Sequence, residues 1–144
     1  MILYLDTSSL VKLVRKDEVH ADQVRMWAAT ADTLATSRVA LPEAAAALAR
    51  RHRLGGLTRR QLTRALSQLG HAWPDYFALD IDERRAARLA VTHGLRGFDA
   101  VHLAAALTVR DALGPDGVAF TSFDAELVRA AIAEKLLVLE PPAA

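Results

Sequence analysis

Four acidic side chains stand where predicted strands end or predicted helices begin. Asp6 directly follows the first apolar run, and Asp124 follows a later apolar run after a short loop. Glu43 lies near the start of an alanine-rich helical segment, and Asp99 opens another helical segment. Carboxylates that converge repel one another, which raises their pKa values or requires a bound cation. If they converge, the set predicts metal-assisted hydrolysis of a phosphodiester, with an activated water attacking in line.

Each acid also has a purely structural explanation. Aspartate is a favoured helix N-cap, so Asp6, Asp99 or Asp124 taken alone could serve only to cap a helix. Glu43 is harder to explain in this way, because its alanine-rich neighbours look buried and buried acids are rare unless paired. The sequence has no cysteine and no histidine pair with zinc-binding spacing. Oxygen ligands of this kind suit Mg²⁺ or Mn²⁺.

The elements that must position these acids alternate between short apolar runs and longer helical segments. The short runs predict buried strands at residues 2–5, 33–36, 77–79, 118–120 and 136–139. Helical spacing predicts helices at residues 9–14, 21–31, 38–53, 58–71, 82–93, 99–113 and 124–134. This alternation indicates an α/β fold with a parallel sheet of four to five strands flanked by helices. Ligands of such folds bind outside the carboxyl ends of the strands, where Asp6 stands.

Length and composition indicate one domain over residues 1–144, with 141–144 as a loose tail. No apolar stretch reaches the roughly 18 residues of a membrane span, so we expect no membrane association. Asp6 interrupts the only early apolar run, which argues against a signal peptide. The absence of cysteine is compatible with a reducing cytoplasm. A net charge of +1 neither requires nor excludes a nucleic-acid partner.

Three motifs with an acid between them carry a family resemblance. MILYLDTSSLVKL, the internal Glu43, RGFDAVHLAAAL and FTSFDAELVRAA together resemble the PIN-domain ribonucleases, and among these the VapC-type toxins of type II toxin–antitoxin pairs. The resemblance implies a three-layer PIN-like fold and an endoribonuclease with a Mg²⁺- or Mn²⁺-binding pocket. Asp6, Glu43, Asp99 and Asp124 match the acidic quartet of that pocket. Family members usually dimerise, cut RNA and are silenced by an antitoxin, which implies a homodimer and these two partners.

The resemblance also implies roles within the site. Asp6, Asp99 and Asp124 would be metal ligands, and Glu43 would be a ligand or a base that orients water, with one metal or two. Hydroxyls beside the acids resemble groups that support such sites, at Thr7 or Ser8 and at Thr121. His102, on the apolar face of its helix, is expected to find a structural partner in the core.

Pro42 directly precedes Glu43 and leaves the direction of its side chain open. The helix either begins at Pro42, a favourable first position, or begins near Ser37 and kinks at the proline. Trp27 and Trp73 are expected to pack in the core or at an interface rather than to stack on bases.

Arginines cluster around the glycine pair at 55–56, and one more lies near Asp99. The candidates for contact with RNA phosphates are Arg59, Arg60, Arg64 and Arg96. The cluster around the glycine pair is equally compatible with solvated helix ends, and its hairpin with a dimer or antitoxin surface. The main alternative function is a non-catalytic PIN-like module that holds RNA or protein. A phosphatase with an aspartate nucleophile is disfavoured, because Ser8 stands where its second aspartate belongs.

Overall fold

The computed structural model describes residues 1–143 and confirms the expected α/β fold. Five parallel strands form one sheet in the order β3-β2-β1-β4-β5. The strands are β1 (Ile2–Leu5), β2 (Thr33–Ser37), β3 (Phe77–Leu79), β4 (Val118–Thr121) and β5 (Leu137–Val138). Because β1 pairs with both β2 and β4, Asp6 leaves the sheet at the middle of its carboxyl edge.

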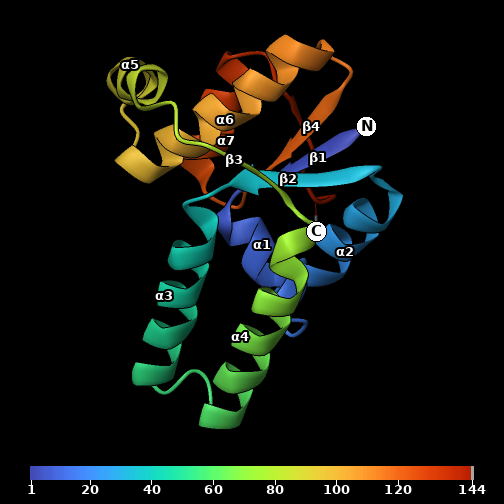
Figure 1. The fold of residues 1–144 in the computed structure, drawn as a ribbon, viewed down its shortest axis with the longest axis vertical. Helices are drawn as coiled ribbons and strands as arrows, with labels where there is room; N and C mark the ends of the chain where they lie inside the picture. Colours follow the sequence, from blue (N-terminus) through green and yellow to red (C-terminus); the bar gives the residue numbers. More distant parts are fainter. Residues whose placement is uncertain (144) are drawn as a thin grey trace.

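Helices cover both faces of the sheet, with α5, α6 and α7 on one side and α1 to α4 on the other (Figure 1). The helices are α1 (Thr7–Val14), α2 (Ala21–Thr30), α3 (Ala40–Arg53), α4 (Arg59–Ala72), α5 (Glu83–His93), α6 (Gly97–Leu113) and α7 (Ala125–Ala133). A short 3-10 turn, Trp73–Asp75, follows α4. Helices α3 and α4 form a hairpin that projects away from the sheet (Figure 1). Among residues 1–143, no helix is both long enough and apolar enough to cross a membrane.

Two apolar cores lie on the two sides of the sheet. Successive side chains of a strand point to opposite faces, so Leu3 and Leu5 pack against α1, α3 and α4, whereas Tyr4 packs against α6. Tyr4 stacks on Phe120 of β4, with ring centroids 5.6 Å apart. Trp73 packs against the α1–α4 core, which agrees with its expected structural role. The central strand β1, which leads to Asp6, is therefore packed on both faces.

Several elements begin or end differently from the sequence-based expectation. Helix α1 begins at Thr7 instead of residue 9, and α6 begins at Gly97, so Asp99 lies within the first turn of α6. Strands β2 and β4 each extend one residue further, whereas β5 is shorter. Residues 141–143 belong to no helix or strand, and Ala144, the end of the expected loose tail, lies outside the described residues.

Neither expected start of the third helix is correct. Helix α3 begins at Ala40, ahead of Pro42, and continues through it. Pro42 lies in the first turn, where a backbone N–H has no partner within the helix, so the missing donor costs little. The next residue already makes a regular helical bond, from Glu43 N to the Val39 carbonyl at 3.1 Å. The carboxylate of Glu43 is thereby placed on the first turns of an unbroken helix.

Candidate active site

Asp6 is held by hydrogen bonds to both of its carboxylate oxygens. Oδ1 accepts from the Ser8 hydroxyl at 2.7 Å and from the Ser9 backbone N–H at 2.9 Å, and Oδ2 accepts from the Ser122 hydroxyl at 2.6 Å. The side chain is therefore the N-cap of α1, as the structural explanation predicts. It is only 3% exposed, so these bonds fix the direction of a buried charge.

Glu43 is held by a chain of buried polar groups that begins at Tyr4. Its Oε1 accepts from the Thr7 hydroxyl at 2.6 Å and from His102 Nε2 at 2.9 Å. His102 Nδ1 lies 2.8 Å from the Tyr4 hydroxyl. Since a carboxylate only accepts, His102 carries a proton on Nε2 and donates it to Glu43. The expected core partner of His102 is thus Tyr4, and the histidine also positions Glu43.

The titration of these groups follows from their surroundings. Burial raises the pKa of Glu43, but hydrogen bonds from His102 and Thr7 outweigh it and leave this pKa below its ordinary value. Burial raises the pKa of the Tyr4 hydroxyl well above its ordinary value, so it remains a donor. Glu43 is therefore an ionised carboxylate in a fixed orientation.

Asp99 shows that the acids lie within electrostatic reach of one another. Burial, followed by the negative charges of Asp124 and Asp6, raises the pKa of Asp99 to about 6. Glu43 adds a smaller effect in the same direction, while the nearby His102 acts in the opposite one. The fold thus gathers all four acids into one negative region, which a bound cation would stabilise.

Three of the four acids line one cleft of about 690 Å³. Glu43, Asp99 and Asp124 contribute to its wall, together with Arg96 and Phe98. Asp124 also caps α7, accepting from the backbone N–H of its third residue at 3.0 Å. Asp6 is buried and is not part of the cleft lining. The arrangement presents three carboxylates to solvent, with a fourth close enough to affect their titration.

Of the hydroxyls expected to support the acids, some contact a carboxylate in the structure and one does not. Ser8 contacts Asp6 and Thr7 contacts Glu43, but the Thr121 hydroxyl donates to the Tyr4 carbonyl at 3.0 Å, where it joins β4 to β1. The role expected of Thr121 belongs to Ser122, which we did not single out from the sequence. The only sequence signal for Ser122 is that its hydroxyl follows that of Thr121 in the TSFD segment. Which of the two hydroxyls reaches Asp6 depends on the direction in which the chain leaves β4.

The expected phosphate-binding arginines fall into two places. Arg96 lies at the cap of α6 and lines the acidic cleft. Arg59, Arg60 and Arg64 lie in the first turns of α4, outside the lining of that cleft. The four arginines that the sequence suggested as phosphate contacts therefore lie on two different surfaces.

The donor set fits a hard, hydrated divalent cation. The acids offer only oxygen atoms, and their repulsion adds to the effect of burial in raising the pKa of Asp99. No group of three histidine or acidic side chains within residues 1–143 lies close enough to enclose an ion. Mg²⁺ does not need such an enclosure, because it keeps several waters and uses one or two carboxylates. The residues present therefore fit an open site for hydrated Mg²⁺ or Mn²⁺ better than a closed structural metal site.

Comparison with known families identifies the fold and its relatives. The family model described as PIN domain matches residues 3–133. The chain belongs to the PIN-domain family. It is 36% identical over 113 residues to Ribonuclease VapC45 of Mycobacterium tuberculosis strain CDC 1551 / Oshkosh and to Ribonuclease VapC49 of strain ATCC 25618 / H37Rv. These alignments cover 76% of this chain and 78% of each relative, which makes the chain a VapC-type member.

Two solved structures share the fold over most of the chain. PAE2754 from Pyrobaculum aerophilum superposes with a TM-score of 0.65 at 22% identity, covering 96% of this chain and 83% of that one. FitAcB from Neisseria gonorrhoeae superposes with a TM-score of 0.66 at 20% identity, covering 97% of each chain. The PIN-like, three-layer architecture expected from the sequence is confirmed.

Proposed function

We propose that this PIN-domain protein is a metal-dependent endoribonuclease and the toxin of a toxin–antitoxin pair. The observation that carries the proposal is the gathering of four acids at the carboxyl edge of the sheet, with the pKa of Asp99 raised to about 6. Relatives named Ribonuclease VapC45 and VapC49 support RNA as the substrate. The complete acidic set favours catalysis over a purely RNA-binding or protein-binding role.

The acids would divide the work of the site. Asp6, Asp99 and Asp124 would hold Mg²⁺ or Mn²⁺, with Asp6 kept in place by its serine hydrogen bonds. When bound, the ion supplies Lewis acidity, which activates water and offsets the negative charge that develops on the phosphate. Arg96 in the same cleft would bind a phosphate of the substrate strand.

Glu43 would act on the attacking water. The hydrogen bonds from Thr7 and His102 leave its second oxygen, Oε2, free to orient that water and accept a proton from it. Because the same bonds lower the pKa of Glu43, the carboxylate stays ionised under neutral conditions. Tyr4 fixes the histidine from behind, so the direction of Glu43 is set by a rigid core.

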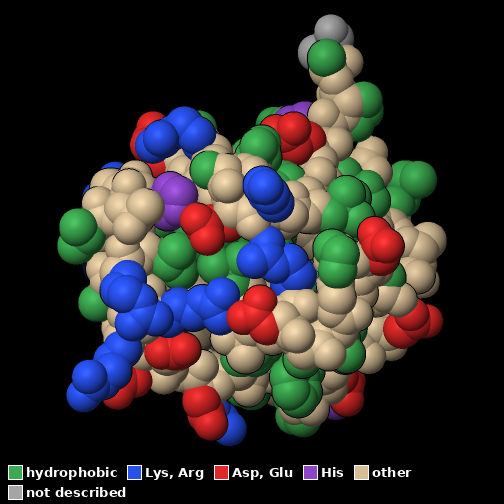
Figure 2. Space-filling view, turned by 90° about the horizontal axis from the view of Figure 1, so that it is seen from above, with side chains coloured by type: hydrophobic (Ala, Val, Ile, Leu, Met, Phe, Trp, Pro, Cys, Tyr) green, Lys and Arg blue, Asp and Glu red, His purple; other side chains and the backbone are tan. Residues whose placement is uncertain are grey.

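The proposal extends to partners and location. We propose a homodimer that acts in the cytoplasm on RNA and is silenced by a cognate antitoxin, with residues 1–144 forming one domain. Ile81 and Phe98, two exposed apolar side chains in the lining of the acidic cleft, support a protein interface at the cleft. Seen from above the α5–α7 side, basic and acidic side chains are mixed with exposed hydrophobic ones (Figure 2).

The test is cleavage of a total RNA pool by the purified protein. With Mg²⁺ or Mn²⁺ we expect discrete fragments, which disappear with a chelator and with Asp6→Asn. The asparagine retains a side-chain oxygen that can cap α1, so a thermal melt should show a folded variant. Asp116→Asn, in the turn before β4, is the control and should cleave normally. Fragments that survive the chelator would contradict the metal mechanism, and no cleavage by folded protein would favour the non-catalytic module.

A further inference from the structure

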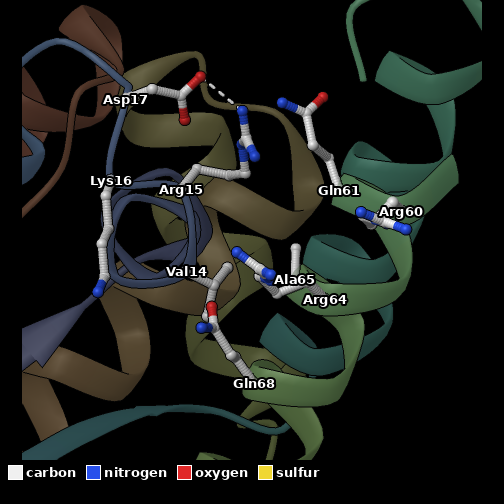
Figure 3. A pocket seen from close by; sticks show the side chains of 9 residues that line it. All are labelled: Val14, Arg15, Lys16, Asp17, Arg60, Gln61, Arg64, Ala65 and Gln68. Carbon is white, nitrogen blue, oxygen red and sulfur yellow. Dashed lines mark hydrogen bonds and ion pairs between the residues drawn. The ribbon is translucent and has the colours of Figure 1, made fainter. Parts of the chain in front are cut away.

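A basic pocket lies where the end of α1 meets α4, outside the acidic cleft. It has a volume of about 340 Å³. Its lining comprises Val14, Arg15, Lys16, Asp17, Arg60, Gln61, Arg64, Ala65 and Gln68. Figure 3 shows Arg15 and Arg64 projecting from the two sides toward one space. The sequence pointed to Arg60 and Arg64, but the residues that follow α1 join them only in the fold.

The charges of this pocket are not balanced by the protein. Arg15 is paired with Asp17, the only acid in the lining. Lys16, Arg60 and Arg64 make no ion pair with any group in residues 1–143. Like charges held near one another are unfavourable, and an anion placed among them removes that cost. The pocket is therefore suited to a negatively charged ligand.

A second hollow extends the first along α4. It has a volume of about 520 Å³ and is lined by Arg59, Arg60, Thr63, Arg64, Ser67 and Gln68. The two hollows share Arg60, Arg64 and Gln68, which follow one another at helical spacing over about 12 Å. We call the joined surface the α4 groove. An elongated basic surface fits a chain of charges better than a single ion.

The side chains of the α4 groove also indicate the class of its ligand. Apart from Val14 and Ala65, its lining consists of cationic, acidic and neutral hydrogen-bonding groups. A protein segment would need apolar side chains to bury at the centre of its interface. Arginine, threonine, serine and glutamine instead match phosphate oxygens and sugars.

We propose that the α4 groove binds the phosphate backbone of a single RNA strand, at a distance from the catalytic acids. This inference rests on the proposed ribonuclease function. Helix α1 runs from Asp6 to the groove and, with its eight residues, separates the two places by about 12 Å. The groove thereby holds the substrate through contacts that do not depend on base sequence, while the cleft acts on the bond that is cut.

The test is the salt dependence of RNA binding, measured in chelator so that the strand stays intact. Arg60→Gln with Arg64→Gln removes two groove charges and keeps good helix formers. Arg84→Gln with Arg88→Gln on α5 removes the same charge at the same spacing, outside the groove, and is the matched control. For the groove variant, the slope of log Kd against log salt should fall by about 1.4, since each phosphate contact on a single strand contributes about 0.7. The control slope should equal that of the unmodified protein.

An unchanged slope in the groove variant overturns the proposal. If inorganic phosphate then stabilises the unmodified protein and not the variant, the groove binds a small anion. If the variant instead changes its mass in light scattering, the groove is a protein interface. Cleavage of the same RNA by the unmodified protein in Mg²⁺ is measured separately. Cleavage with an unchanged slope rejects only the groove, whereas a reduced slope without cleavage rejects only the nuclease.

Discussion

Asp99→Asn is expected to abolish RNA cleavage while making the metal-free protein more stable. Asp99 is half-buried, and burial together with the charges of Asp124, Asp6 and Glu43 raises its pKa to about 6. Without a bound cation, its ionised form is therefore a cost to the folded state. Asparagine has nearly the same shape and carries no charge, so it removes that cost together with a proposed metal ligand. We expect cleavage to fall by at least about a hundredfold, a typical loss when a charge-stabilising group is removed.

The stability gain depends on pH in a defined direction. A carboxyl whose pKa is raised by folding favours the native state only while protonated, so its contribution is lost as pH rises from 3.8 to about 6. Near neutral pH the wild type bears the full cost, which we reduce for partial solvent exposure to about 1 kcal/mol. Thermal unfolding in chelator should therefore show the variant about 3 °C higher. The difference should shrink as the pH is lowered below about 6.

Mg²⁺ should reverse the order of the two proteins. A ligand that binds only the native state stabilises it, so the wild type should gain more from the ion than Asp99→Asn. Asp116→Asn, which lies away from the acids, should behave as wild type in both conditions. A variant that is less stable than wild type in chelator would show that the four carboxylates do not repel one another as described.

His102→Leu is expected to cause the largest loss of stability among single changes around the site. The substitution keeps a similar volume but removes the hydrogen bonds to the Tyr4 hydroxyl and to Glu43. The buried Tyr4 hydroxyl then loses its hydrogen bond to the imidazole ring, and the half-buried Glu43 carboxylate keeps only the hydrogen bond from Thr7. Losing both should lower the free energy of unfolding by about 2–4 kcal/mol. Denaturant unfolding near neutral pH measures this difference.

The pH dependence separates the two lost bonds. The lowered pKa of Glu43 contributes stability that is present above the ordinary value of 4.5 and is lost as pH falls through the lower, folded value. Without His102 that contribution shrinks, so the deficit of the variant should be largest near neutral pH and smaller in acid. Tyr4→Phe removes only the hydrogen bond between the Tyr4 hydroxyl and His102. It should lower the free energy of unfolding by about 1 kcal/mol, and this loss should not depend on pH as that of His102→Leu does. Equal losses in the two variants would contradict the positioning of Glu43 by His102.

The positions of the strands along the chain and the acids at their ends were the parts of this molecule that local sequence could predict. Apolar runs bounded by glycine, proline and aspartate mark strands, and a carboxylate after such a run lies at the carboxyl edge of a parallel sheet. This suffices to find Asp6 and Asp124. The capping explanation and the catalytic one turned out to be compatible, because the acid that caps α1 also contributes to the charge around Asp99.

The contacts that support the acids could not be predicted in the same way. Whether Thr121 or Ser122 reaches Asp6 depends on how the chain leaves β4, which is a property of the packed sheet. Pro42 indicated either a helix start at the proline or a start near Ser37 with a kink, whereas α3 begins at Ala40, two residues ahead of the proline. Arg15 and Arg64 line the same pocket only because two helices that are far apart in the sequence meet in the fold. These features arise from tertiary packing, which single-sequence patterns do not encode.

The most direct test of the acidic site is to locate Mn²⁺ in crystals of the protein by anomalous scattering. We expect a peak at the cleft lined by Asp99 and Asp124, close to Asp6, and its loss in crystals of Asp99→Asn. Occupied Mn²⁺ elsewhere on the surface, with none among these carboxylates at saturating metal, would contradict the assignment of the four acids as a metal-dependent catalytic site.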